Sequence, residues 1–242
     1  MLLIEGRNAV REALRNGEKI ENIMASKSTH NHTFQEIIGL AKAKKIKLQW
    51  VDNSTLDRTS KTGKHQGIIA ETSDYDYSTL TEILNVSKTK GTEPFILVLD
   101  GIEDPHNLGS IIRVCECFGV DGIIIGKNRA CNVNETVIKT SAGATAYVKI
   151  AKVTNINQAI EELKENNIWV YGCELGGEDI NHTDFSGGVA LVIGSEGFGT
   201  SALTLKLCDK RVTIPMCGHV NSLNASVATG IAINTIYTKK HQ

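Results

Sequence analysis

The sequence predicts an α/β protein in which a mostly parallel sheet is covered by helices on both faces, preceded by a smaller α/β unit. Apolar runs of strand length alternate with helical stretches from residue 95 onward. The runs Phe95–Leu99 and Val189–Ile193 are apolar throughout, which is typical of strands buried on both faces of a parallel sheet. Of 242 residues, 41% are hydrophobic and 22% charged, so the composition is globular and excludes a disordered chain.

The sequence pattern over residues 1–72 predicts a small unit of alternating helices and strands. A helix over Arg7–Asn16 ends at Gly17, and a second helix spans Phe34–Ala43. Short strands are expected near residue 23, over 46–51 and over 67–70. Residues 73–94 are polar, with a short helical piece around 80–84, and are interpreted as the linker to a second domain over 95–242.

In the second domain the pattern predicts an alternation of strands and helices. In chain order these are strand Phe95–Asp100, helix Leu108–Phe118, strand Gly122–Ile125, helix Ile156–Asn166, strands Ile168–Gly172, Val189–Ile193 and Val212–Ile214, and a closing helix Asn224–Tyr237. Ligands of such sheets bind at the carboxyl ends of the strands. Three loops follow strands here, and we expect them to carry the function.

The charge is unevenly distributed, although the net charge is only −1. Residues 1–71 hold 12 Lys and Arg against 8 Asp and Glu, while residues 72–242 hold 14 against 19. The positive charge of this N-terminal unit is consistent either with an ordinary solvated surface or with a module that binds nucleic-acid phosphates.

The start of the sequence, its apolar runs and its cysteines argue against several classes of protein. The start MLLIEGR is charged at once, unlike a signal peptide, and no apolar run approaches the ~20 residues of a membrane span, so we expect a cytoplasmic protein. The six cysteines lack the paired spacing of a zinc site, so we expect reduced, buried thiols and no metal.

The first loop and the helix after it run from Asp100 to Arg113. Asn107 stands where a helix N-cap is expected, and Gly109 lets another segment approach the helix closely. Arg113 has a candidate partner in Glu116, three residues further on. Taken singly, each of these residues has a structural explanation.

The second loop is Gly194-Ser-Glu-Gly-Phe-Gly199. Its glycines allow a sharp turn with backbone amides open to a ligand, but neither a P-loop nor a dinucleotide-binding motif is present. Glu196 within the turn is either a solvated carboxylate or one with a polar partner.

The third loop runs from Ile214 to Ser226 and leads into the closing helix. Ser222, Asn224 and Ser226 crowd a helix start, although capping requires only one of them. Small residues in the helix, among them Ala228 and Gly230, allow close packing against another backbone.

Together, DPHNLGSIIR, LVIGSEGFG and IPMCGHVNSLNASVATGIAI resemble, in order and spacing, the three motifs of the SpoU/TrmH class of SPOUT RNA 2′-O-ribose methyltransferases. The front segments IEGRNAVREAL and GKHQGIIA resemble the ribosomal-protein-like substrate-binding domain of the subgroup that includes the bacterial 23S rRNA guanosine-2′-O-methyltransferase. Phe198 and Cys217 depart from the family pattern, which has a polar residue and a small residue at these positions.

The resemblance implies a trefoil-knotted domain that binds S-adenosyl-L-methionine, an exception to the rule that chains are unknotted. It also implies a homodimer with RNA as partner. By similarity the cofactor contacts are made by Gly194, Ile214, Met216 and Leu223.

The catalytic residues implied by the resemblance are Asn107, Arg113, Glu196, Ser222 and Asn224. Arg113 would contact the target phosphate and ribose. Because a guanidinium stays protonated in proteins, we interpret Arg113 as lowering the pKa of the 2′-hydroxyl, while a water or a phosphate oxygen takes the proton. Asn107 would organise the catalytic loop, Glu196 would orient Arg113 or Asn224, and Ser222 and Asn224 would hold the site.

Three other functions are weighed against methylation of a guanosine of 23S rRNA. The same chemistry on tRNA is the nearest alternative. A non-catalytic RNA-binding or ribosome-assembly protein would have no reason to retain all five catalytic residues. A nucleotide-dependent oxidoreductase would carry the dinucleotide fingerprint and its downstream acidic residue, which we do not find.

Overall fold

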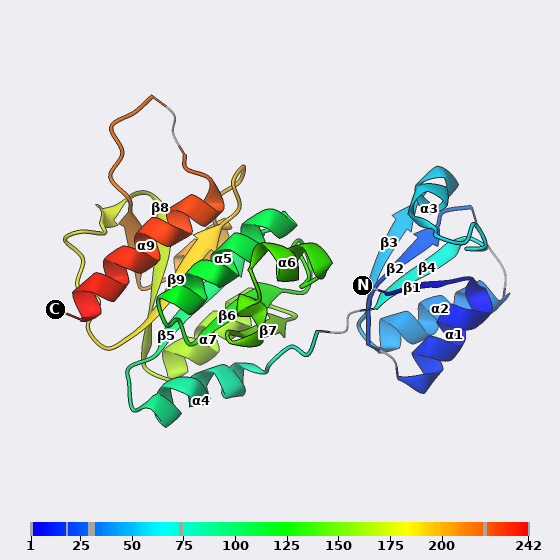
Figure 1. Ribbon diagram of the computed structural model, residues 1–242, viewed down its shortest axis with the longest axis horizontal. Helices are drawn as coiled ribbons and strands as arrows, with labels where there is room; N and C mark the ends of the chain where they lie inside the picture. The colour runs from blue at the N-terminus through cyan, green and yellow to red at the C-terminus, as the bar shows by residue number, and fades with distance from the viewer. Residues whose placement is uncertain (1, 18, 29–31, 73–74, 220–221, 242) are drawn as a thin grey trace. The chain divides into compact units, whose positions relative to one another are not determined.

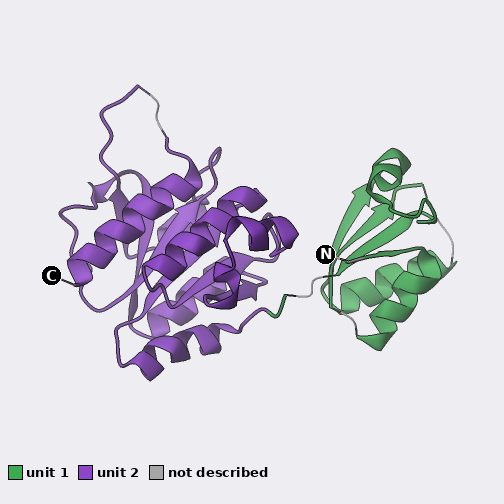
Figure 2. Cartoon of the chain, viewed as in Figure 1, with its two compact units in different colours: residues 1–76 green, residues 77–242 purple. Residues whose placement is uncertain are grey.

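The chain folds into two units, each built around its own sheet (Figures 1 and 2). The structure is a computed structural model that describes residues 2–17, 19–28, 32–72, 75–219 and 222–241. Unit 1 comprises Met1–Asp76 and unit 2 comprises Tyr77–Gln242. The mixed α/β class expected from the sequence is confirmed.

Unit 1 is a four-stranded sheet of order β1-β4-β2-β3, with α1 and α2 packed on one face (Figure 1). Its elements are β1 (Leu2–Glu5), α1 (Arg7–Asn16), β2 (Ile20–Ser26), α2 (His32–Ala43), β3 (Lys47–Val51), α3 (Asn53–Thr59) and β4 (Ile68–Thr72). Gly17 ends α1 in the left-handed conformation, as the sequence predicts. The prediction missed β1 and α3, because β1 has only four residues and α3 buries only Leu56.

Unit 2 is a six-stranded parallel sheet of order β10-β8-β9-β5-β6-β7. Its strands are β5 (Phe95–Asp100), β6 (Gly122–Gly126), β7 (Lys149–Val153), β8 (Ile168–Asp179), β9 (Gly188–Gly194) and β10 (Lys210–Thr213). Its helices are α4 (Leu80–Lys90), α5 (Pro105–Cys117), α6 (Glu135–Thr140), α7 (Ile156–Glu165), α8 (Ala202–Leu207) and α9 (Ala225–Lys240), with a short 3₁₀ turn at Ala144–Ala146.

Helices cover both faces of this sheet. The helices α4 and α7 bury Ile83 and Ile160 against Ile96 and Val98 of β5. The helices α5 and α9 pack against each other on the other face (Figure 1). The central strands are therefore buried on both sides, which explains why they read as uninterrupted apolar runs.

Most of the segment expected to be a linker, residues 73–94, belongs to unit 2. A capping box between Thr79 and Glu82 starts α4, and Leu80, Ile83 and Leu84 of this helix are buried in the sheet's core. The short helical piece expected around residues 80–84 is the start of this helix, which continues to Lys90, and the polar composition of the segment led to its assignment to the linker. Residues 77–94 are consequently part of the domain, not a connection to it.

Other differences from the prediction involve short or irregular elements. The strand β7 and the helices α6 and α8 were not expected, and β8 extends past Gly172 to Asp179. All six cysteines are free thiols, but only Cys115 and Cys131 are buried; Cys173 and Cys208 are half-buried, and Cys117 and Cys217 are exposed. Among the described residues, no helix has the length and apolar character needed to cross a membrane.

The topology places the candidate loops at one edge of the sheet. From β5 the chain runs outward through β6 and β7, and then returns to the other side of β5 to form β8, β9 and β10. The switch point lies between β5 and β9, where Asp100 and Gly194 are register partners. The crevice outside such a switch point is the usual ligand site of an open α/β sheet.

Candidate active site

The second loop is a tight turn fixed to the end of β5. Ser195 and Gly199 exchange backbone hydrogen bonds of 3.1 and 2.9 Å, and the backbone N–H of Ser201 donates to the Asp100 carboxylate at 3.0 Å. A Cβ on Gly194 would lie 2.1 Å from the carbonyl carbon of Gly199, so only glycine permits the chain to fold back here.

A hydrogen-bonded cluster joins all three loops. The amide nitrogen of Asn107 donates to Glu196 Oε1 at 3.0 Å, and that of Asn224 donates to the same oxygen at 2.5 Å and to Asn107 Oδ1 at 2.9 Å. The backbone N–H of Ala225 adds a fourth hydrogen bond, to Glu196 Oε1 at 3.1 Å. Three residues separated by up to 117 positions in the sequence thus meet at one carboxylate, and we call them the three-loop cluster.

The structure corrects the role expected for Asn107 and assigns the N-cap of α9 to Asn224. The N-cap of α5 is Asp104, whose carboxylate accepts from the N–H groups of His106 and Asn107, with Pro105 in the first turn. Asn107 is therefore inside the helix, and its side chain is free to reach Glu196. Asn224, by contrast, is the N-cap of α9 and uses its oxygen for Ser226 and Val227 and its nitrogen for the cluster.

Arg113 lies on α5, exposed, and no interaction with Glu116 or Glu196 is found among the described residues. Of the two partners expected for Glu196, the structure therefore provides Asn224 and not Arg113. Gly109 allows a close approach, as predicted: a Cβ there would lie 2.7 Å from Cβ of Thr140, the last residue of α6.

A cavity of about 390 Å³ opens beside the cluster, between the second and third loops. The predicted cofactor residues Gly194, Ile214, Met216 and Leu223 line it, together with the predicted catalytic residue Ser222. Glu174 and Leu175 also line this cavity, and the prediction from the sequence did not include them. They lie level with Gly194 because Cys173 pairs with Ile193, so extending the rule of strand carboxyl ends to β8 would have identified them.

The chemistry of this lining favours a cationic ligand with an apolar body. Glu174 and Glu196 contribute carboxylates, Ile214 and Leu223 contribute apolar walls, and none of the described lining residues is a cation. Such a lining fits an adenosine that carries a sulfonium and an amino acid moiety, and it does not fit a pyrophosphate. Burial and the charge of Glu174 raise the pKa of the Cys173 thiol to about 11, so this cysteine stays protonated near neutral pH.

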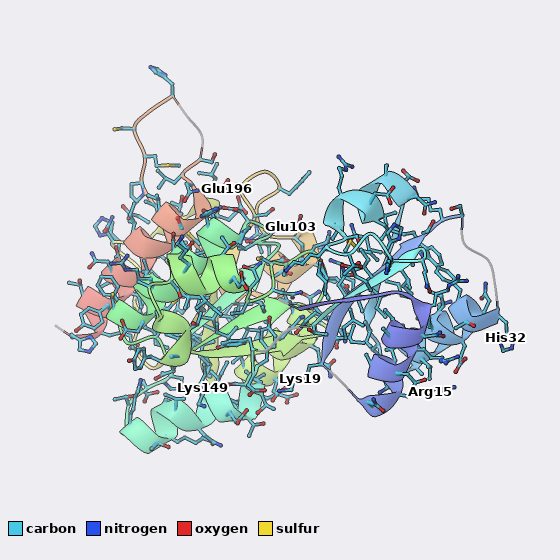
Figure 3. All side chains as sticks on the ribbon, turned by 45° about the vertical axis from the view of Figure 1, so that its right-hand side comes forward. Arg15, Lys19, His32, Glu103, Lys149 and Glu196 are labelled. Atoms are coloured by element: carbon cyan, nitrogen blue, oxygen red, sulfur yellow. The ribbon has the colours of Figure 1, made fainter. Side chains whose placement is uncertain are left out.

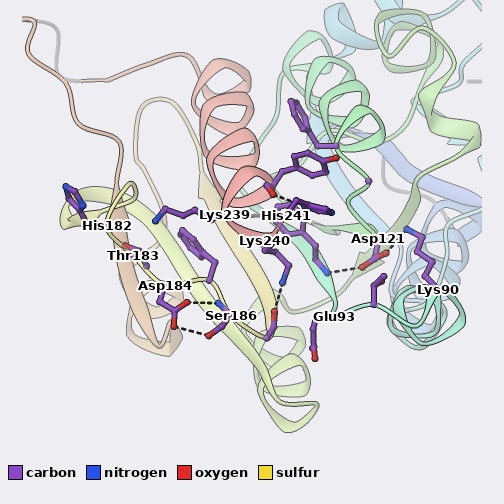
Figure 4. Close-up of a pocket in the computed structure, with 17 residues that line it drawn as sticks. Lys90, Glu93, Asp121, His182, Thr183, Asp184, Ser186, Lys239, Lys240 and His241 are labelled. Atoms are coloured by element: carbon purple, nitrogen blue, oxygen red, sulfur yellow. Dashed lines mark hydrogen bonds and ion pairs between the residues drawn. The ribbon is translucent and has the colours of Figure 1, made fainter.

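A larger cavity, of about 860 Å³, lies at the opposite edge of the sheet (Figure 4). It is next to the amino ends of β5 and β9, and two of its lysines already have partners: Lys90 pairs with Asp121 at 2.8 Å, and Lys240 donates to the backbone carbonyl of Gly187 at 2.5 Å. Its position at the amino ends of the strands argues against it as the active site. The described residues contain no group of three or more potential metal ligands.

In unit 1 a carboxylate organises the segment that precedes β4. Glu5, at the end of β1, accepts hydrogen bonds from Ser60 Oγ at 2.5 Å, from the backbone N–H of Lys61 at 2.7 Å, and from both the N–H and the hydroxyl of Thr62. Burial raises the pKa of Glu5, but these hydrogen bonds outweigh it and lower the pKa to about 2. We call residues 60–64 the Glu5 loop.

The cations of unit 1 fall into two groups. On α1, Arg11 and Arg15 form ion pairs with Glu12 and Glu36. Lys61 and Lys64 of the Glu5 loop are exposed, and no acidic partner of either is found in the part of the chain that the structure describes. Unpaired cations on a rigid loop are available to an anionic partner, whereas the paired ones are already neutralised.

The fold, the three-loop cluster and the cavity beside it together define a methyltransferase-like α/β protein with a separate N-terminal unit. The model of the SpoU rRNA methylase family matches residues 94–234, and a model described as RNA 2′-O ribose methyltransferase substrate binding matches residues 3–78. The chain belongs to the SpoU rRNA methylase family and is an RNA methyltransferase, as its resemblance to SpoU/TrmH enzymes implies.

Relatives cover nearly the whole chain. YacO of Bacillus subtilis, named for the TrmH family of tRNA/rRNA methyltransferases, is 41% identical over 98% of this chain and 95% of its own. A Staphylococcus aureus protein with the same family name is 42% identical over 99% of this chain and 96% of its own.

Solved structures share the fold. The SpoU methyltransferase AviRb from Streptomyces viridochromogenes, in complex with AdoMet, superposes with a TM-score of 0.62 at 20% identity and covers 100% of this chain and 91% of that one. The AdoMet-bound rRNA methyltransferase from Sinorhizobium meliloti gives a TM-score of 0.57 at 23% identity, with 99% and 87% coverage. The TrmH/SpoU tRNA modifying enzyme of A. aeolicus superposes with a TM-score of 0.57 at 26% identity, and the match covers 67% of this chain and 81% of that one.

Proposed function

We propose that this protein transfers a methyl group from S-adenosyl-L-methionine to a ribose 2′-hydroxyl of RNA, and that its substrate is a guanosine of 23S rRNA. The observation that carries the proposal is the three-loop cluster, which holds Asn107, Glu196 and Asn224 beside a cavity suited to a cationic nucleoside. The family membership and the substrate-binding front domain support RNA as the acceptor.

S-Adenosyl-L-methionine, when bound, supplies a methyl group activated by the sulfonium charge. Gly194, Ile214, Met216 and Leu223 would hold its adenosine, since all four line the cavity. Ser222 lines the same cavity and offers a hydroxyl to the ligand. The cluster keeps the second and third loops together, and so maintains the shape of the cavity between them.

The remaining requirement is to activate a poor nucleophile. A ribose 2′-hydroxyl reacts only when it is positioned in line with the methyl group and relieved of its proton. Arg113 is exposed and unengaged by Glu116 or Glu196 among the described residues, so its guanidinium is available to bind the target phosphate and to stabilise the developing alkoxide. A water or a phosphate oxygen takes the proton.

The role of Arg113 is tested by the substitution Arg113→Ala. We expect methyl transfer to fall by about 10²–10³-fold, because one charged donor to the reacting oxygen is removed. Since Arg113 does not line the cavity, cofactor affinity measured by calorimetry should remain unchanged. Turnover at the wild-type rate would remove Arg113 from the mechanism.

The substrate is tested by supplying labelled S-adenosyl-L-methionine with unmodified large-subunit rRNA or with bulk tRNA and then mapping ribose methylation. Label on one guanosine ribose of rRNA is the expected result. Label on tRNA alone would keep the reaction and replace the substrate. Cofactor binding with no label on either RNA would indicate an assembled precursor as substrate, and no cofactor binding would favour a non-catalytic RNA-binding protein.

We include a homodimer and a cytoplasmic location in the proposal. The helix α9 leaves Val227, Ile231 and Tyr237 between 38% and 49% exposed, which supports a partner on this helix. Light scattering of the purified protein should give twice the mass of one chain, and fractionation of cells should recover the protein with the soluble RNA-bearing fraction.

A further inference from the structure

A second, smaller cavity adjoins the cofactor cavity. It has a volume of about 260 Å³ and lies between the first loop, where Glu103 contributes to its lining, and the turn Ser195–Phe198. The same turn lines the cofactor cavity on its other side. A group bound in the smaller cavity is therefore separated from the cofactor only by this turn, and the volume suits one nucleobase better than a larger ligand.

Phe198 stands at the tip of that turn and is 97% exposed. The base of the turn is held by the paired hydrogen bonds of Ser195 and Gly199 and by the attachment of Glu196 to the three-loop cluster. The exposed ring is therefore presented from a fixed support. An exposed aromatic ring beside a nucleotide-modifying site is the side chain on which unpaired bases stack.

Glu103 faces the same cavity from the first loop, and Figure 3 shows Glu103 and Glu196 on the same side of unit 2. Its neighbours on both sides are anchored: Ile102 is buried and accepts a hydrogen bond from the N–H of Cys131 at 2.8 Å, and Asp104 caps α5. The Glu103 carboxylate is exposed, and no partner for it is found in the described ranges. A pair of acceptor oxygens is thus available at the cavity.

The lining selects the chemistry of the occupant. Glu103 and Asp104 are acidic, and no described lining residue is a cation, so the cavity disfavours a phosphate and favours a group that offers hydrogen-bond donors. Guanine is the standard base with two adjacent donors, N1–H and the N2 amino group, on its Watson–Crick edge. A carboxylate accepts both in one bidentate contact.

We propose that this cavity binds the base of the target nucleotide, with Phe198 stacked on it and Glu103 accepting from the N1–H and N2 amino groups of an unpaired guanine. The inference rests on the proposed function and deepens it, because it assigns the recognition of the base to two residues that carry no part of the methyl transfer itself. Phe198 is also where this chain departs from the polar residue of the family pattern.

The stacking is tested with Phe198→Ala, Phe198→Tyr and, as a matched control, Leu203→Ala. Leu203 is 59% exposed on α8 and lines neither cavity. We expect Phe198→Ala to raise KM for the RNA by about 5- to 100-fold, the effect of removing one stacked base, while Phe198→Tyr and Leu203→Ala stay within twofold of wild type. If Phe198→Ala instead weakens cofactor binding without raising KM for RNA, or turns a dimer into a monomer, the ring has another partner and the proposal is wrong.

The contact with the base edge is tested with Glu103→Gln and with an RNA in which inosine, which lacks the N2 amino group, replaces the target guanosine. Wild type should prefer guanosine by at least tenfold in kcat/KM, and Glu103→Gln should reduce this preference to below threefold. An unchanged preference in Glu103→Gln would overturn the assignment.

A binding measurement separates this proposal from the proposed function. With S-adenosylhomocysteine present, saturation-transfer NMR should detect guanosine on the wild-type protein, and Phe198→Ala should abolish the signal. That signal from a protein that methylates no RNA would uphold the base site and refute the enzyme. RNA methylation that neither Phe198→Ala nor Glu103→Gln alters would uphold the proposed enzyme activity and refute the base site.

Discussion

Each unit contains a glutamate whose carboxylate accepts several hydrogen bonds, but the two glutamates have different structural roles. In unit 1, Glu5 binds donors from three consecutive residues, 60–62, and so stiffens one local loop. In unit 2, Glu196 binds residues 89 and 28 positions away and so assembles a site from separate loops. The donors of Glu5 all belong to one continuous segment, so this carboxylate shapes a single loop, whereas the donors of Glu196 come from two separate loops, so this carboxylate joins them.

The difference predicts a large effect on activity at Glu196. In Glu196→Gln one acceptor oxygen is replaced by an amide NH₂, which cannot accept hydrogen bonds. If this NH₂ faces the amide nitrogens of Asn107 and Asn224, donors oppose donors; if the remaining oxygen faces them, it is the single acceptor left for both. We expect the loops to shift and methyl transfer to fall about 100-fold, with weaker cofactor binding. Steady-state kinetics and calorimetry measure both quantities.

Glu116→Gln is the control, because Glu116 is exposed on α5 and lies outside the cluster. It should behave as wild type. Equal reductions of activity in the two variants would mean that the cluster has no special role and that the comparison of the two glutamates fails.

The Glu5 loop predicts an intermediate effect, on RNA binding alone. The double variant Lys61→Ala/Lys64→Ala should bind RNA more weakly and lower the slope of log K against log salt by about 2, one for each phosphate that is no longer neutralised. Arg11→Ala/Arg15→Ala removes the same charge from ion-paired positions and should change the slope less. Equal slopes for the two double variants would show that pairing does not select the RNA-binding cations.

The smallest expected effect is on the pH dependence of stability. The folded-state pKa of Glu5, about 2, lies below its ordinary value of 4.5, so its ionised form stabilises unit 1 fully above pH 4.5, and this contribution disappears as the pH falls from 4.5 toward 2. Glu5→Gln should make unit 1 less stable at pH 6 and should flatten the decline of stability over that acidic range.

Trp50 lies in unit 1 and Trp169 in unit 2, so the fluorescence of a Trp169→Phe background follows unit 1 alone during urea unfolding. If Glu5→Gln leaves the pH profile of unit 1 unchanged, the Glu5 loop is held by other contacts.

Much of the architecture could be predicted from local physics. The helix Arg7–Asn16 was predicted with its observed bounds, because an amphipathic stretch is followed by a glycine that adopts the left-handed conformation. The central strands β5 and β9 were predicted because burial on both faces leaves continuous apolar runs. Elements with one short apolar face, such as α3 and α4, were missed or mistaken for linker.

The candidate site was predictable as a set of residues but not as a set of contacts. Asn107 was expected to cap α5, yet Asp104 does so, because either residue satisfies the local capping pattern. Which of them reaches Glu196 depends on how β5 and β9 pair, through the register of Asp100 with Gly194. Glu174 follows the carboxyl end of a predicted strand and so could have been found from the sequence, whereas only the fold brings Glu103 to a cavity.

The sequence by itself determined the fold class and the three loops, because periodicity, glycines and capping patterns are local properties, and its resemblance to SpoU/TrmH enzymes implied the residues of a methyltransferase site. Only the tertiary structure decided that Glu196 meets Asn107 and Asn224, that Arg113 has neither Glu116 nor Glu196 as a partner among the described residues, and that Phe198 stands between two cavities. These contacts join residues far apart along the chain, so they depend on strand order and register, which no local pattern encodes.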